Sequence, residues 1–82
     1  MKIRIIYVDG TTADTKISIG DRYAWEKTHK KSISEFEKNP ALGDLLWMAH
    51  RSLSRVEQNI APLDTWINQV DDFDIVDSDP KS

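Results

Sequence analysis

The sequence predicts a small α+β domain in which an N-terminal β-hairpin packs on about three α-helices. Two observations predict this class. Two runs rich in β-branched residues flank an Asp-Gly pair near the start, and apolar residues later recur at helical spacing. A chain of 82 residues has room for one modest core. We therefore expect a single domain over residues 1–73 and an acidic, flexible tail over 74–82.

The predicted hairpin covers residues 2–19. The run KIRIIYV precedes Asp9-Gly10, and TTADTKISI follows it with alternating apolar and polar positions. Asp and Gly tolerate the positive φ of tight hairpin turns, so this pair between two extended runs favours a hairpin.

A first helix is expected over about 21–30. Gly20 ends the second strand, and Asp21 is the predicted N-cap. In the ambiguous stretch that follows, Ser32 is expected to cap a short turn that carries Ile33 and Phe36 inward.

Two further helices are predicted from Pro residues that mark their first turns. Asn39-Pro40 begins a central helix over about 40–57, and Ala61-Pro62 begins a last helix over 62–72. The apolar stripe of the central helix consists of Leu42, Leu45, Leu46, Ala49, Leu53 and Val56. The last helix repeats Leu63, Trp66, Ile67, Val70 and Phe73. We expect Trp66, and also Trp25 in the first helix, to lie in the core.

Composition removes several classes of function. The chain has 11 Lys and Arg against 14 Asp and Glu, and this net charge of −3 argues against binding to nucleic acid or anionic lipid. The absence of Cys excludes a disulfide framework, thiolate catalysis and a Cys-based zinc site. No apolar run approaches the roughly 20 residues of a membrane helix.

The candidate chemical sites are weak. We expect that the protein binds no metal and no cofactor and that it is not an enzyme. His50 and Ser54 lie one helical turn apart, but no Gly-rich turn is present to supply an oxyanion site, so we interpret them as a surface pair. His29 falls in a basic run that favours a solvated helix end over a site for an acidic partner. The run contains Lys27, Lys30 and Lys31. The C-terminal aspartates lack the Gly and the bidentate Glu of a calcium loop. They are Asp71, Asp72, Asp74, Asp77 and Asp79.

The most informative feature is apolar. On the central helix Trp47 lies about 140° from Leu42, away from the apolar stripe, and Met48 flanks the opposite side. Trp and Met are enriched at the centres of protein interfaces. Leu46, Trp47 and Met48 are therefore the candidate partner-binding residues. The alternative, in which the hairpin or the Ile33–Phe36 turn covers Trp47, has equal weight.

Four stretches together resemble the short tail assembly chaperones of long-tailed bacteriophages, in particular those of phages that infect actinobacteria. They are KIRIIYVDGTT, IGDRYAWEK, LLWMAHRSLSR and LDTWINQVDDFDIVDSDP, in this order. The likeness covers most of the chain and consists of packing patterns, with no catalytic signature.

The resemblance implies a non-enzymatic protein that binds the tape measure protein and keeps its apolar helical segments soluble during tail assembly. It also implies a location in the host cell cytoplasm, absence from the mature virion, and a longer frameshifted form that meets the tail tube protein. The short form would then stop near Ser82. Self-association through Trp47 is left open. The alternative function is a phage-encoded interaction module, an inhibitor or adaptor that binds a host protein.

Overall fold

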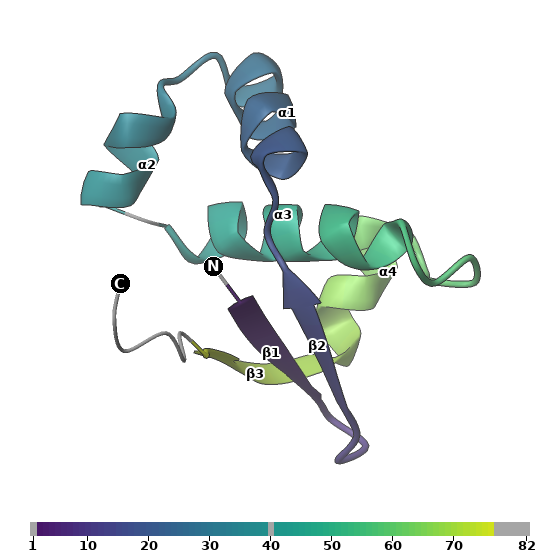
Figure 1. The fold of residues 1–82 in the computed structure, drawn as a ribbon. Coiled ribbons are helices and arrows are strands. Elements are labelled where there is room, and N and C mark those ends of the chain that lie inside the picture. Colours follow the sequence, from purple (N-terminus) through teal and green to yellow (C-terminus); the bar gives the residue numbers. More distant parts are fainter. Residues whose placement is uncertain (1, 40, 77–82) are drawn as a thin grey trace.

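The computed structural model describes residues 2–39 and 41–76 and has the α+β architecture that the sequence predicts (Figure 1). The elements in chain order are β1 (Lys2–Tyr7), β2 (Thr12–Lys16), α1 (Ile19–His29), α2 (Ile33–Lys38), α3 (Leu42–Ser54), α4 (Leu63–Trp66), a 3-10 turn η1 (Ile67–Gln69) and β3 (Val70–Ile75). None of the helices in these two ranges is long and apolar enough to cross a membrane.

The predicted hairpin is confirmed, but its second strand ends at Lys16, earlier than the predicted bound at residue 19. Strands β1 and β2 pair antiparallel, with Ile5 opposite Ala13. The turn closes with a bond from the Tyr7 N–H to the Thr11 carbonyl, and Gly10 adopts a φ of 91° that suits a residue without Cβ. The Asp9 carboxylate accepts bonds from the N–H and hydroxyl of Thr11, which fixes the turn.

A third strand replaces most of the predicted last helix. The helix expected over 62–72 is limited to α4, and the chain then turns into β3, which pairs antiparallel with β1 to give the order β2-β1-β3. Ile6 lies opposite Asp72, whereas Tyr7 lies opposite Val70, so Asp71 is an extra residue in a β-bulge. Because of the bulge, Val70 and Phe73 both pack against the core although they are three residues apart, a spacing that also fits a helix.

The prediction of a tail over 74–82 is wrong for its first two residues. Asp74 and Ile75 belong to β3, where Arg4 and Ile3 lie opposite them on β1. Asp74 thus joins a cross-strand charge ladder in which Arg4 also pairs with Asp14 at 2.8 Å. The expected flexibility of residues 77–82 lies outside the described residues.

The first two helices begin at serine residues. Helix α1 starts two residues earlier than predicted, with Ser18 as its N-cap, and Asp21 lies in its first turn. The Ser18 N–H donates to the Asp21 carboxylate at 2.9 Å, as in a capping box. Ser32 caps α2, as predicted, and Phe36 on this helix is buried.

Helix α3 is the central element of the fold. Figure 1 shows it between the sheet on one side and helices α1 and α2 on the other. Its inner face is buried and consists of Leu45, Leu46, Met48, Ala49, Ser52 and Leu53. Leu42 and Val56 were predicted in this stripe but are 58% and 77% exposed, because α3 begins at Leu42 and ends before Val56. Trp25 and Trp66 are buried in the core as predicted.

Candidate functional site

The three residues predicted to bind a partner do not form one surface. Leu46 and Met48 are only 6% and 1% exposed and belong to the core, so their assignment to an exposed face is wrong. Consecutive residues on a helix point about 100° apart, and a run of three therefore cannot share one narrow face. Trp47 is half-buried, packed at the edge of the core on the side of α3 that faces away from the sheet.

A groove follows this outer side of α3. We define the α3 groove by the six residues that line it, which are Trp47, His50, Arg51, Ser54, Arg55 and Leu63. Its volume is about 390 Å³. Trp47, Arg51 and Arg55 follow one another at intervals of four residues, so they form a row along the helix. None of the six residues is acidic.

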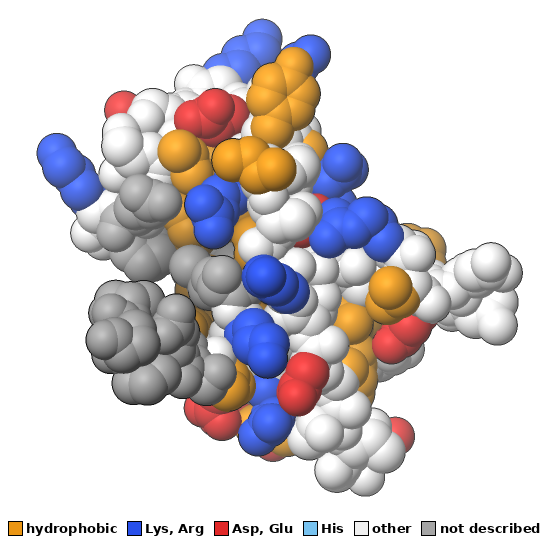
Figure 2. Space-filling view, viewed as in Figure 1, with side chains coloured by type: hydrophobic (Ala, Val, Ile, Leu, Met, Phe, Trp, Pro, Cys, Tyr) orange, Lys and Arg blue, Asp and Glu red, His pale blue; other side chains and the backbone are white. Residues whose placement is uncertain are grey.

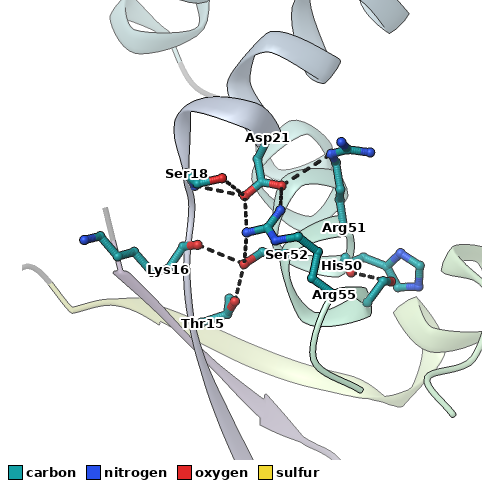
Figure 3. A network of polar contacts seen from close by, with 9 residues as sticks. Thr15, Lys16, Ser18, Asp21, His50, Arg51, Ser52 and Arg55 are labelled. Atoms are coloured by element: carbon teal, nitrogen blue, oxygen red, sulfur yellow. Dashed lines mark hydrogen bonds and ion pairs between the residues drawn. The ribbon is translucent and has the colours of Figure 1, made fainter. Parts of the chain in front are cut away.

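A buried carboxylate holds the two arginines of the groove (Figure 3). Asp21 on α1 is completely buried, and both of its oxygens accept bonds from the Arg55 guanidinium. Arg51 Nε lies 3.4 Å from Asp21 Oδ1. The arginine side chains remain about half exposed, at 48% for Arg51 and 46% for Arg55. The Arg55 guanidinium is therefore tethered through both of its terminal nitrogens, whereas Arg51 contacts Asp21 only through Nε.

The environment of Asp21 keeps its carboxyl ionised. Burial by itself raises the pKa of Asp21, but the bonds from Arg55 and from the N–H and hydroxyl of Ser18 favour the charged form more strongly. The pKa of Asp21 consequently lies below its usual value. The same contact raises the pKa of the Arg55 guanidinium. The network continues to β2 through Ser52, whose hydroxyl donates to the Lys16 carbonyl at 2.9 Å and contacts the Thr15 hydroxyl.

Aromatic contacts fix the Trp47 end of the groove. The His29 ring lies edge-on to Trp47 at 5.3 Å between centroids and stacks on buried Trp25 at 5.1 Å. Its Nδ1 lies 3.0 Å from the Trp25 carbonyl, and its Nε2 lies 3.9 Å from Asp44. His29 thus joins α1 to α3. The prediction that it belongs to a solvated helix end is therefore wrong.

His50 and Ser54 form no nucleophile-base pair. His50 Nε2 donates to the Ala61 carbonyl at 2.7 Å, and its ring packs edge-on to Trp66. The Ser54 hydroxyl donates to the His50 backbone carbonyl at 2.8 Å. His50 therefore ties the segment before α4 to α3 and positions Leu63 as a wall of the groove.

The remaining candidate residues are solvent-facing. Lys27, Lys30 and Lys31 are exposed, as are Asp71, Asp72 and Asp74; Asp77 and Asp79 lie outside the described residues. Within residues 2–39 and 41–76, no three His, Asp or Glu side chains are grouped so that they could hold a metal ion.

A second apolar feature lies on α1. Ile19 and Tyr23 are 79% and 62% exposed, and the ammonium of Lys27 lies 5.6 Å from the centroid of the Tyr23 ring. Figure 2 shows hydrophobic side chains over α1 with Lys and Arg side chains around them. Neither Ile19 nor Tyr23 lines the α3 groove, so this feature is separate from it.

Sequence reasoning identified Trp47 but missed Arg51, Arg55 and Leu63 as its companions. The four-residue spacing of Trp47, Arg51 and Arg55 was a usable signal. The sequence carries no signal that Asp21, 30 or more positions earlier in the chain, anchors both arginines.

No protein family, curated protein or solved structure matches this chain.

Proposed function

We propose that this chain is a non-enzymatic binding protein of the tail assembly chaperone kind, which holds apolar helical segments of a tape measure protein in solution. The partner follows from the resemblance of the four sequence stretches to that family. The structural support is independent of the resemblance and concerns only the capacity to bind.

The observation that carries the proposal is the α3 groove. Trp47 and Leu63 offer an apolar surface that the domain leaves half-open, and two tethered arginines lie beside it. Trp and Arg are the side chains most enriched among residues that dominate binding energy. A groove along one helix suits an amphipathic helix from a partner, since such helices dock their apolar face into apolar grooves.

The polar groups around the groove support binding over catalysis. The ring nitrogen of His50 and the hydroxyl of Ser54 are both engaged with backbone carbonyls, and the Asp21 carboxylate is occupied by Arg55 and Ser18. These groups stabilise the shape of the groove. A charged surface elsewhere on the domain would keep a complex with an apolar segment soluble.

Co-expression tests the proposal. A tagged copy of this chain is produced together with the product of the long coiled-coil gene that the proposal expects downstream, the candidate tape measure protein, and the soluble fraction is purified through the tag. We expect the large partner to be soluble and to co-purify, whereas it should be insoluble when expressed alone.

The alternative function predicts another result. If the chain is an inhibitor or adaptor, the tape measure protein stays insoluble, the chain elutes alone, and no long coiled-coil gene follows its own. That combination would reject the chaperone proposal in favour of a host-protein partner.

A further inference from the structure

We propose that the α3 groove selects an acidic amphipathic helix. One large apolar side chain of the partner enters between Trp47 and Leu63, and two carboxylates on successive turns pair with Arg51 and Arg55. This inference rests on the proposed function, because it names the chemistry of the helical segment that the chain would hold.

The spacing of the groove residues sets the pattern of the partner. Trp47 and Arg51 on α3 and Arg55 at its C-cap stand at i, i+4 and i+8, so neighbours in this row are about 6 Å apart. A partner helix laid along the row presents its own side chains with the same repeat. The complementary pattern is one large apolar residue followed by two acidic residues at intervals of four.

The tether to Asp21 prepares the arginines for this pairing. Arg55 donates to both oxygens of the buried carboxylate, and its Nη2 also lies 3.4 Å from the Ser52 hydroxyl. Arg51 contacts Asp21 only through Nε, so its terminal nitrogens have no partner among the described residues. A long side chain that is already ordered loses less conformational entropy when it binds a ligand.

The charge of the groove favours an acidic partner. Asp21 supplies one buried negative charge against two arginines, which leaves an excess positive charge at the mouth. The six lining residues add no acidic group to compensate it. The groove is thus a local positive site on a chain of net charge −3, and such complementarity selects the partner and its orientation.

A nucleic acid fits the same features less well. Affinity for a phosphate backbone grows with the number of phosphates that are neutralised, and only two arginines line the groove. The half-buried Trp47 is held edge-on by His29 at one end of the row. We therefore infer a protein helix as the occupant, and binding of an oligonucleotide becomes an outcome of the test.

The experiment uses two stapled helical peptides and the full chain labelled with ¹⁵N. The acidic probe carries Leu, Glu and Glu at i, i+4 and i+8, and the basic probe carries Leu, Lys and Lys. Three tryptophan indole N–H signals report on Trp25, Trp47 and Trp66, and Trp→Phe variants assign them. We expect the acidic probe to shift the Trp47 signal, and the basic probe to bind at least about 10-fold more weakly.

A charge exchange makes the test specific. Arg51→Glu should weaken the acidic probe about 10-fold and strengthen the basic probe, because repulsion replaces attraction. Lys2→Glu makes the same charge change on the exposed first residue of β1 and should leave both affinities within about 2-fold. Thermal melting of each variant verifies that it is folded.

Several results would overturn the inference. They are equal binding of the two probes, a response confined to Ile19 and Tyr23 on α1, or tighter binding of a short oligothymidine than of the acidic probe.

The proposed function can fail separately from this inference. If the acidic probe binds but the tape measure protein does not co-purify, the assignment of the groove to an acidic helix is supported and the chaperone role is rejected. If the tape measure protein co-purifies equally with Arg51→Glu and wild type, the groove assignment falls and the chaperone role stands.

Discussion

The inner and outer faces of α3 carry different kinds of side chain. The inner face is fully apolar apart from Ser52 and is closed by the sheet and α1, with Leu53 only 1% exposed. The outer face places half-buried Trp47 beside two half-exposed arginines. A residue on the inner face is thus committed to stability, whereas one on the outer face is available to a partner. Substitutions on the two faces should separate these roles.

Truncation of the inner face should have the largest effect on stability. Leu53→Ala removes a buried side chain and leaves a cavity, which costs about 2–5 kcal/mol of the free energy of unfolding. Urea denaturation followed by circular dichroism measures this loss. A cost below about 1 kcal/mol would mean that the inner face is less tightly packed than the contacts indicate.

Removal of the Asp21 carboxylate should have the second largest effect on stability. Asp21→Asn leaves Arg51 and Arg55 without their buried counter-charge, but water reaches both half-exposed guanidinium groups. We expect a loss of about 2–3 kcal/mol in urea denaturation at neutral pH. Asp14→Asn is the matched control, since its ion pair with Arg4 is exposed and contributes little.

The same carboxylate should give the wild-type chain a specific dependence on pH. The pKa of Asp21 is lower in the folded state than in the unfolded chain, where it is about 3.9. Its contribution is therefore complete above that unfolded value and is lost as pH falls through the lower, folded value. The stability difference between wild type and Asp21→Asn should shrink on acidification. A difference that stays constant between pH 7 and pH 2 would contradict the ionised state of Asp21.

Two serines on opposite faces of α3 provide the finest comparison. Ser52→Ala removes the donor to the Lys16 carbonyl and should cost about 1–2 kcal/mol. Ser54→Ala removes only a bond to the preceding turn of an exposed helix surface and should change stability by less than about 0.5 kcal/mol. Equal costs in urea denaturation would remove the distinction between the faces.

Predictions from the sequence were correct where the interacting residues are close in the chain and wrong where they are far apart. The hairpin was predictable because Asp9 and Gly10 join strands that are adjacent in the chain. Strand β3 was missed because its partner β1 lies nearly 70 residues away. The bulge at Asp71 also lets Val70 and Phe73, three residues apart, pack against the core together, and this spacing is the one expected of a helix.

Only part of the candidate site could be predicted from the sequence. The angular position of Trp47 on the helix followed from 100° per residue, and the structure places it at the edge of the core. Its neighbour Met48 was assigned to the surface because the sequence does not show which elements cover a helix. The tether of Arg51 and Arg55 depends on Asp21, a residue that the sequence suggested as an N-cap.

The most direct test of the account is the amount of tape measure protein that co-purifies with Trp47→Ala. Because Trp47 is only half-buried, this variant should keep its cooperative thermal transition, which is checked on the same preparation. We predict that the folded variant retains less than about a tenth of the partner that wild type retains. A folded variant that retains the partner in full would contradict the outer face of α3 as the binding surface, and loss of the thermal transition would assign Trp47 to the core.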